Sequence, residues 1–342
     1  MSQQLIDVAK VLQTPLRLNG SPGDRVLIMT DTQMDPLLWQ GLAIATNSLG
    51  MEPIVTMMPA RERHGADPAS PVRLAALDPQ VQLVVYLTST AMAHAPLTEE
   101  LVRAQKKFLL MEELTVAMLA PGGPASADYA AINRLGQSIA KIFTEGESVT
   151  VTCPSGTNLT ASIKGRTGRS IAGIPLALRP GGGGGSAFPD GEAHVCPVEE
   201  TGEGVVVFDL TAHSTGSLKE PIILTIEKGY VRKIEGGYQA EIWRSILAQA
   251  NDPLSYNCPA EIAIGLNPKV TPTGSMRTDK KMYGASHIGV GDTVVLGGNC
   301  HAKLRLEGVL RHPEICVDGV KLTQGGQILV APQGNCEHPS HV

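Results

Sequence analysis

The N-terminal part of the chain alternates short apolar runs with stretches whose apolar positions recur at the helical period. The runs at residues 24–31 (DRVLIMTD) and 82–90 (QLVVYLTST) are continuous, which is typical of strands buried on both faces. The segments 36–50 (PLLWQGLAIATNSLG) and 97–107 (LTEELVRAQKK) follow a helical period, and the latter has acids early and bases late, as the helix dipole favours. This alternation predicts a parallel, doubly wound sheet.

From residue 146 onwards the pattern changes to alternation with period two. Residues 148–165 (SVTVTCPSGTNLTASIKG) predict a hairpin, and the segments 220–237 and 314–330 predict further strand pairs joined at GY, DG and GG turns. One helical segment, 236–252, interrupts them. We therefore expect an α/β fold with a doubly wound N-terminal domain, followed by a β-rich α+β C-terminal domain.

Length and composition support this division and narrow the class of protein. A chain of 342 residues is long for a single core, and we expect the two domains to occupy residues 1–145 and 146–342. A net charge of −5 and an aromatic content of 4% argue against a nucleic-acid partner. No run approaches the roughly 18 apolar residues of a membrane helix. The first residues lack the pattern of a signal peptide, which predicts a cytoplasmic protein with no membrane partner.

The spacing of the cysteines and the lack of a glycine-rich nucleotide motif argue against a zinc cluster and a nucleotide site. The six cysteines form no CxxC pair, which in a cytosolic chain indicates free thiols rather than a disulfide framework or a zinc cluster. No GxGxxG or Walker motif follows the first predicted strand, so no nucleotide cofactor is expected.

Candidate chemistry lies in the last third of the chain. Glu261, His287 and Glu307 stand in three glycine-punctuated segments, AEIAIGLNP, GASHIGVGD and AKLRLEGVL, and Glu192 stands upstream in FPDGEAHVCP. Carboxylates and imidazoles hold divalent metals and transfer protons, so these four residues are candidate metal ligands or acid–base groups. Glu192 is equally compatible with a solvated turn, and His287 with a strand end where its ring bonds to backbone.

The segment around Glu307 places two charged residues on one side of a strand. In KLRLEGVL the alternation puts Arg305 and Glu307 on the same face. Arg305 is then a candidate to polarise a carbonyl or hold an anion, since its planar fork matches such oxygens. A solvated strand of alternating charge is the other interpretation. Glu261 lies among apolar residues and needs a partner if buried, and that partner could be a metal, a proton or Arg305.

Two histidines complete the set of candidates. His94 follows a predicted parallel strand, at the edge of the sheet where ligands of open α/β sheets collect, although it could simply flank a helix. His301 could join His287 and Glu307 in a metal site. Asp31 and Asp35 also follow a strand, but we expect them to serve as helix N-cap and first-turn acids.

A series of segments in a specific order resembles a known superfamily. The series is CPSGTNLTASIKGR, FPDGE, CPVEETGEGVVVFD, AEIAIGLNP, GASHIGVGD and the final acidic segment followed by VDGVKL. Together these segments resemble the thermophilic metalloaminopeptidases of the aminopeptidase T type and their ring-cleaving relatives, the 2,5-dihydroxypyridine 5,6-dioxygenases. The resemblance implies the two-domain fold and a homodimer.

The resemblance also implies ligand positions. The aminopeptidase pattern places metal-binding glutamates at Glu192 and Glu261 and a histidine at His287, and its His-x-Asp pair falls on Arg305-x-Glu307. The dioxygenase pattern of two histidines and an aspartate around Fe(II) falls on Glu261, Arg305 and Glu307, and its substrate base falls on His94. Arginine stays protonated and cannot ligate a metal, so this chain departs from both patterns at residue 305.

These observations predict an enzyme that opens a hydroxylated N-heterocyclic ring of a small-molecule substrate. Either Fe(II)-dependent dioxygenation or hydrolysis of a cyclic amide is compatible with the residues, with His94 as base and with Glu307, Glu261 and His287 as ligands or acid–base groups. The alternatives are an aminopeptidase or amidase that uses Zn²⁺, Mn²⁺ or Co²⁺, and a metal-free protein that binds a small anion through Arg305.

Overall fold

The computed structural model describes residues 2–63, 65–93, 95–174 and 184–332. The chain divides into two compact units, the first formed by Met1–Tyr129 with Ile171–Asp190 and the second by Ala130–Ser170 with Gly191–Val342. A single boundary after residue 145 was expected from the sequence. The units differ from it because the chain leaves the second unit after residue 170 and adds one more strand to the sheet of the first.

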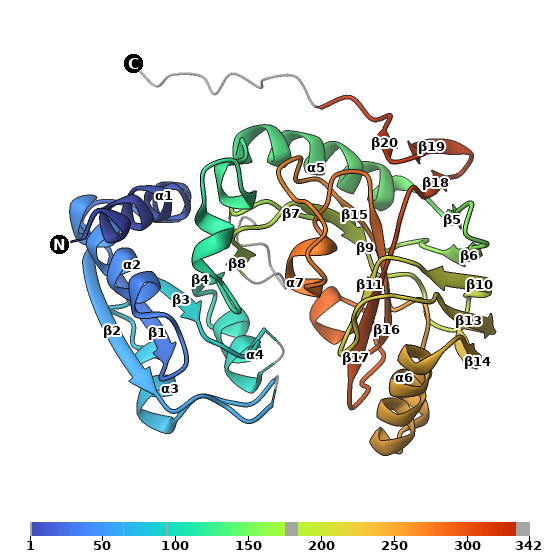
Figure 1. The fold of residues 1–342 in the computed structure, drawn as a ribbon, viewed down its shortest axis with the longest axis horizontal. Helices are drawn as coiled ribbons and strands as arrows, with labels where there is room; N and C mark the ends of the chain where they lie inside the picture. Colours follow the sequence, from blue (N-terminus) through green and yellow to red (C-terminus); the bar gives the residue numbers. More distant parts are fainter. Residues whose placement is uncertain (1, 64, 94, 175–183, 333–342) are drawn as a thin grey trace. The chain divides into compact units, whose positions relative to one another are not determined.

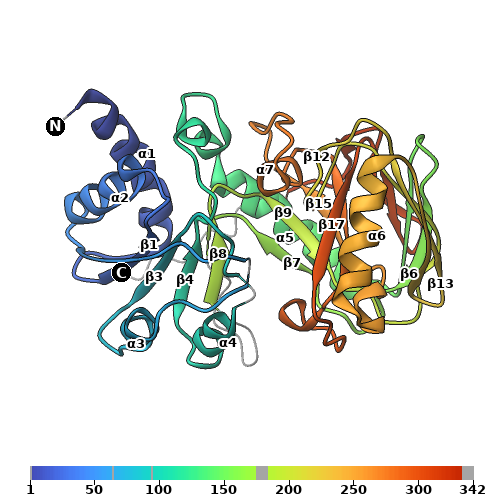
Figure 2. The same cartoon turned by 60° about the horizontal axis from the view of Figure 1, so that its bottom comes forward.

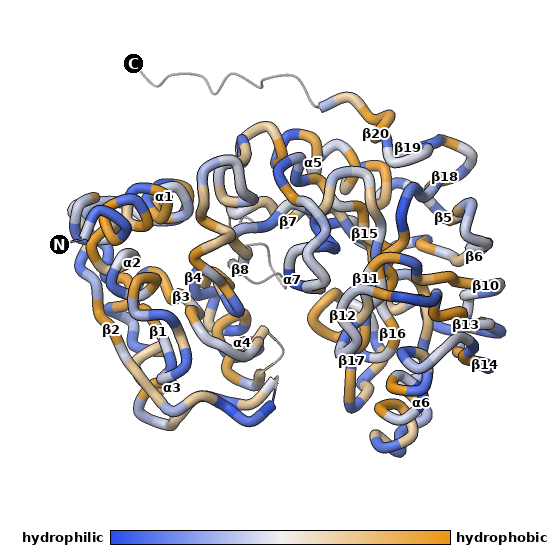
Figure 3. Tube along the Cα trace, in the orientation of Figure 1, coloured by the Kyte–Doolittle hydropathy of each residue, from blue (hydrophilic) through white to orange (hydrophobic). Residues whose placement is uncertain are grey.

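The first unit contains a five-stranded sheet in the order β2-β1-β3-β4-β8, and every pair in it is parallel (Figure 1). Its strands are β1 (Arg25–Asp31), β2 (Glu52–Met58), β3 (Leu83–Leu87), β4 (Lys107–Leu110) and β8 (Gly184–Ala187). Strands β1 and β3 match the predicted apolar runs 24–31 and 82–90. Figure 3 shows apolar residues gathered along β1, β3 and β4. The predicted fold class is therefore confirmed in this unit.

Helices accompany these strands. They are α1 (Gln3–Asn19), α2 (Pro36–Ser48), α3 (Ser70–Leu77) and α4 (Pro96–Arg103), with the 3-10 turns η1 (Val116–Leu119) and η2 (Pro124–Ser126). Two of them, α2 and α4, fall on the helical segments 36–50 and 97–107 predicted from periodicity. Asp35 caps α2 by accepting a hydrogen bond from the backbone N–H of Leu37 at 2.9 Å, as expected. Asp31 was expected to act at the same helix start, but it is the buried last residue of β1 and accepts hydrogen bonds from Gln33 and Ser89 instead.

The second unit contains two sheets. The eight-stranded sheet has the order β14-β13-β10-β6-β5-β18-β19-β20, and its pairs are antiparallel. Its strands are β5 (Ser148–Thr152), β6 (Asn158–Ser162), β10 (Glu203–Phe208), β13 (Ile222–Glu227), β14 (Tyr230–Glu235), β18 (Glu314–Val317), β19 (Val320–Gln324) and β20 (Gln327–Ile328). The predicted hairpins β5–β6, β13–β14 and β18–β19 are all present.

The seven-stranded sheet has the order β12-β11-β17-β16-β15-β9-β7 and carries the candidate residues. Its strands are β7 (Arg169–Ile171), β9 (Glu192–Val195), β11 (Thr211–Ala212), β12 (Gly216–Ser217), β15 (Glu261–Gly265), β16 (Ser286–Gly291) and β17 (Arg305–Leu310). Strands β9, β15, β16 and β17 pair antiparallel in that spatial order. The candidate residues from four separate segments are thereby brought to one sheet.

Two longer helices, α5 (Tyr129–Glu145) and α6 (Tyr238–Ala250), accompany the sheets of the second unit. Three short ones are α7 (Met276–Asp279), η3 (Pro253–Tyr256) and η4 (Val294–Leu296). Figure 2 shows α6 running alongside the strands of this unit. Within the described residues, no helix combines the length and the apolar character that crossing a membrane requires.

A glycine in β17 allows the two sheets of the second unit to approach closely. A Cβ atom at Gly308 would lie 2.3 Å from the ring of Phe208 on β10. Phe208 is fully buried and its ring centroid lies 5.3 Å from that of Trp243 on α6. Because the contact is continuous with a buried aromatic pair, β17 has little freedom to move away.

We expect Gly308→Ala to lower the free energy of unfolding by about 1–3 kcal/mol, because the added methyl group overpacks this contact. Urea unfolding measures the change. In a Phe208→Leu background the same substitution should cost less, since the ring it collides with is gone. Equal costs in the two backgrounds would show that Gly308 is not required by the aromatic contact.

Candidate functional site

The candidate residues of the second unit lie on one face of the seven-stranded sheet. Side chains two residues apart on a strand share a face, which pairs Glu192 with His194 on β9 and Arg305 with Glu307 on β17. In the ladder Glu261 of β15 lies opposite Gly289 of β16, and Gly289 lies opposite Glu307.

A second row of the ladder lies beside the first. Ala263 of β15 lies opposite His194 on one side and His287 on the other. Both imidazoles and all three carboxylates are buried, with relative exposures between 0% and 4%. Glu192 and Glu307 are therefore not the solvated acids that the sequence also permitted.

Gly289 creates the space in which the charged groups of neighbouring strands meet. A Cβ atom at this position would lie 2.8 Å from a terminal nitrogen of Arg305 and 3.2 Å from the Cβ of Glu261. Because Gly289 has no side chain, the guanidinium of Arg305 can lie over β16, the strand between β15 and β17. The glycine that the sequence showed beside His287 thus has a steric role.

Arg305 joins the two carboxylates that flank this glycine. Its Nε donates to Oε1 of Glu307 at 3.0 Å, a terminal nitrogen donates to Oε2 of Glu261, and the other donates to the backbone oxygen of Asp292 at 2.8 Å. Arg305 is one of the three partners of Glu261 that were considered from the sequence, beside a metal and a proton. Since every guanidinium nitrogen already donates to a protein oxygen, the arrangement favours positioning of the carboxylates over contact with a substrate.

Two lysines that the sequence did not single out complete the site. Lys280 and Lys281 directly follow α7. Nζ of Lys280 donates to Oε2 of Glu307 at 2.6 Å, and Nζ of Lys281 donates to Oε2 of Glu192. A pair of adjacent lysines is usually solvated, so no local signal distinguished them. Hereafter the charged cluster means the following side chains: Glu192, His194, Glu261, Lys280, Lys281, His287, Arg305 and Glu307.

The cations keep the carboxylates ionised. Burial by itself raises the pKa of a carboxyl group, but Arg305 and then His194 counter it and bring the pKa of Glu261 to about 2. Burial is likewise outweighed at Glu192 by Lys281 and at Glu307 by Lys280, and the pKa of each lies well below its usual range. All three carboxylates are therefore anionic near neutral pH.

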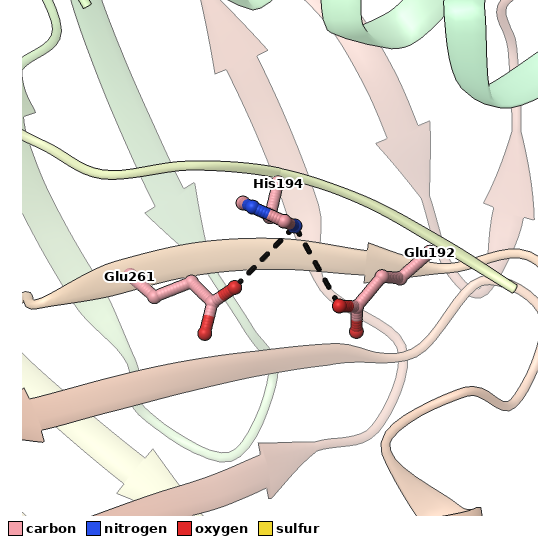
Figure 4. A group of neighbouring side chains, drawn as sticks. All are labelled: Glu192, His194 and Glu261. Carbon is pink, nitrogen blue, oxygen red and sulfur yellow. Dashed lines mark ion pairs between the residues drawn. The ribbon is translucent and has the colours of Figure 1, made fainter. Parts of the chain in front are cut away.

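Two groups of potential metal donors occur in the described part of the chain. The first donor group is Glu192, His194 and Glu261, and the second donor group is Glu261, His287 and Glu307. Figure 4 shows the first donor group, in which Nδ1 of His194 lies 3.5 Å from Oε1 of each glutamate. In the second, Nε2 of His287 lies 3.5 Å from Oε2 of Glu261. Among the described residues, neither imidazole has a hydrogen-bond partner.

His194 was not identified from the sequence, although a signal was present. The segment EAHV places a carboxylate and an imidazole two residues apart, which on a strand aims both at one side. His287 lies within β16 rather than capping a strand end, and its ring makes no backbone hydrogen bond among the described residues.

The two remaining candidates, His301 and His94, are not part of the charged cluster as the structure describes it. His301 is exposed and belongs to neither donor group, so it does not join His287 and Glu307 in a donor group. His94 lies outside the described residues, so the base proposed at this position has no structural description.

The donor set can be tested against the metal that the resemblance implies. The positions that the dioxygenase pattern assigns to iron, at residues 261, 305 and 307, do not fit an ion, because Arg305 occupies one of them and donates to the other two. The first donor group fits, because two carboxylate oxygens face a buried imidazole nitrogen that has no hydrogen-bond partner among the described residues.

Comparison with known proteins supports the resemblance found in the sequence. The NicX family profile, described as 2,5-dihydroxypyridine 5,6-dioxygenase, matches residues 8–330. A 2,5-dihydroxypyridine 5,6-dioxygenase of Pseudomonas putida is 28% identical over 158 residues, which cover 43% of this chain and 45% of that protein. The aligned part thus spans less than half the length of this curated relative.

Solved structures show the same fold. The structure of 2,5-dihydroxypyridine dioxygenase from Pseudomonas putida KT2440 matches with a TM-score of 0.81 and 22% identity, covering 95% of this chain and 97% of that one. Wild-type AmpT from Thermus thermophilus matches with a TM-score of 0.68 and 15% identity, covering 95% and 99%.

The profile match extends over nearly the whole chain, and the predicted family is confirmed by it. This protein belongs to the 2,5-dihydroxypyridine 5,6-dioxygenase family, whose members are enzymes, and within that family it carries arginine between two glutamates on β15 and β17.

Proposed function

We propose that the protein opens the ring of a hydroxylated N-heterocycle, a small-molecule substrate, by oxygenation at the charged cluster. The observation that carries the proposal is the buried face on which three carboxylates and two imidazoles meet, in a chain whose family profile covers residues 8–330. Buried ionisable groups are costly unless they bind something, so such a concentration is typical of a reaction site.

A divalent metal, iron by the resemblance, is part of this proposal. The residues that would hold it are the carboxylates and imidazoles of the two donor groups. When bound, such an ion supplies open positions for oxygen and substrate. The homodimer and the cytoplasmic location expected from the sequence remain predictions.

The side chains of this protein supply orientation and charge. Arg305 and Lys280 fix both oxygens of Glu307, and Arg305 also fixes one oxygen of Glu261. These contacts hold the two carboxylates as anions with restricted rotamers, because a rotation would break a charge-assisted hydrogen bond in a buried site. Glu261 and Glu307 are therefore suited to binding cationic groups, and their low pKa values make them weak proton acceptors near neutral pH.

We expect the Fe(II)-loaded protein to consume oxygen when given 2,5-dihydroxypyridine, and Glu261→Gln to reduce kcat/KM at least about 100-fold, since it removes a charge shared by both donor groups. An oxygen electrode measures the rate, and loss of the pyridine absorbance measures ring opening. Lys233→Met, at an exposed site on β14, is the control and should retain wild-type activity. Hydrolysis of a cyclic amide or of a leucyl anilide without oxygen uptake would contradict the proposal and favour a hydrolase.

We expect Arg305→Met to lower the free energy of unfolding by about 3–5 kcal/mol, because it leaves two buried carboxylates without their shared cation. Urea unfolding at neutral pH measures the loss. The matched control is Lys233→Met, which removes the partner of Glu235 in a pair whose side chains are 63% and 46% exposed. Its expected cost is below about 1 kcal/mol. A similar small cost for both variants would show that the Arg305 contacts do not hold the carboxylates.

A further inference from the structure

We infer that the metal site of this protein is the first donor group, in which Oε1 of Glu192, Nδ1 of His194 and Oε1 of Glu261 are the protein ligands. This inference rests on the metal dependence included in the proposed function. It assigns a ligand role to His194, and it moves the ion away from residues 305 and 307, where the resemblance places it.

The spacing of the three atoms fits an ion. Metal bonds of about 2.1 Å at tetrahedral angles separate neighbouring ligand atoms by about 3.4 Å. Nδ1 of His194 lies 3.5 Å from Oε1 of Glu192 and 3.5 Å from Oε1 of Glu261. That distance is long for a hydrogen bond and suits two ligands of one ion. His194 is 2% exposed, so water from the bulk does not satisfy its ring.

In Glu192 and Glu261 the carboxylate oxygen that faces away from His194 is held by a cation. Oε2 of Glu192 accepts from Lys281, and Oε2 of Glu261 accepts from Arg305. Each carboxylate therefore directs its Oε1 atom toward His194, as the dashed lines of Figure 4 show. Such outer contacts orient metal ligands and tune their affinity. Lys281 and Arg305 are positioning residues in this arrangement.

The second donor group is less suited to an ion because its oxygens are already engaged. Oε2 of Glu261 and Oε1 of Glu307 accept from Arg305, and Oε2 of Glu307 accepts from Lys280. An ion bound there would have to displace a guanidinium or an ammonium group. An ion in the first donor group displaces neither.

The balance of charge suggests how the substrate takes part. The three glutamates of the charged cluster are matched by Arg305 and the two lysines, so a divalent ion adds buried charge that the protein does not neutralise. A hydroxylated heterocycle bound as its oxyanion supplies the missing negative charge. Metal and oxyanion should therefore strengthen each other's binding, as linkage requires.

The experiment is an anaerobic titration of the metal-free full-length protein with Co²⁺, followed by visible absorption and by metal analysis after gel filtration. It is performed with and without 2,5-dihydroxypyridine. Two matched pairs of variants test the ligand set: Glu192→Gln against Glu307→Gln, which remove the same charge, and His194→Leu against His287→Leu. Thermal melting verifies that each variant is folded, and the glutamine substitutions keep the side-chain shape if a leucine variant fails to fold.

The expected result is one Co²⁺ per wild-type chain, with an affinity at least about 5-fold higher when 2,5-dihydroxypyridine is present. Glu192→Gln and His194→Leu should weaken Co²⁺ binding by about 100-fold or more, whereas Glu307→Gln and His287→Leu should change it less than about 10-fold. The assignment would be overturned if Glu307→Gln weakened Co²⁺ binding more than Glu192→Gln, or if His287→Leu weakened it more than His194→Leu. It would also be overturned if the wild-type protein bound no Co²⁺ with or without 2,5-dihydroxypyridine.

Activity separates this inference from the proposed function. Oxygen-dependent ring opening by a protein that binds no metal would overturn the metal site and leave the reaction standing. A protein that has the expected metal site but opens no heterocyclic ring would overturn the proposed function and leave the metal site standing.

Discussion

The contact on which the site depends is the guanidinium of Arg305 between Glu261 and Glu307. It crosses the middle of three antiparallel strands and holds two buried carboxylates that would otherwise repel each other. Buried like charges are tolerated only where a cation with good geometry lies between them, and the planar fork of arginine offers that geometry. At Glu261 and Glu307 this pairing determines which carboxylate oxygens remain for other partners: Oε2 of Glu307 for Lys280 and Oε1 of Glu261 for the side of His194.

Small residues make the contact possible. Gly289 lies between the two glutamates in the ladder, and Ala263 lies between the two histidines. Large side chains at these positions would fill the face on which the charges meet. On the opposite side of β17, Gly308 brings the strand against Phe208, so the strand that carries Arg305 and Glu307 is held by packing on both faces.

The chain thus has the fold of the family, whereas the charges at the site differ from the ligand pattern that the resemblance implies. Where the resemblance places a metal-binding histidine, this chain carries Arg305, a permanent cation that cannot ligate a metal, and Lys280 and Lys281 bring further positive charge to the site. The carboxylate oxygens without a cation partner among the described residues, Oε1 of Glu192 and Oε1 of Glu261, both lie beside His194 of β9. Similar folds can in this way support different ligand sets, because the sheet provides the positions and the side chains decide what binds.

Much of the fold follows from local pattern. The apolar runs of β1 and β3, the helical period of α2 and the hairpin β5–β6 are determined by burial and turn chemistry within short segments. Strand β8 was not predicted, because a short glycine-rich segment gains its partner only by pairing with β4 from far along the chain.

The same distinction holds for the site. Sequence alternation determined that Arg305 and Glu307 share a face. The apolar residues around Glu261 determined that this carboxylate needs a partner if it is buried. Only the tertiary structure decided that this partner is Arg305, that Lys280 and Lys281 neutralise the other carboxylates, and that His194 joins Glu192 and Glu261. The reason is physical: alternation fixes the face of a strand to which a side chain points, whereas charge pairing depends on the register between strands distant in sequence.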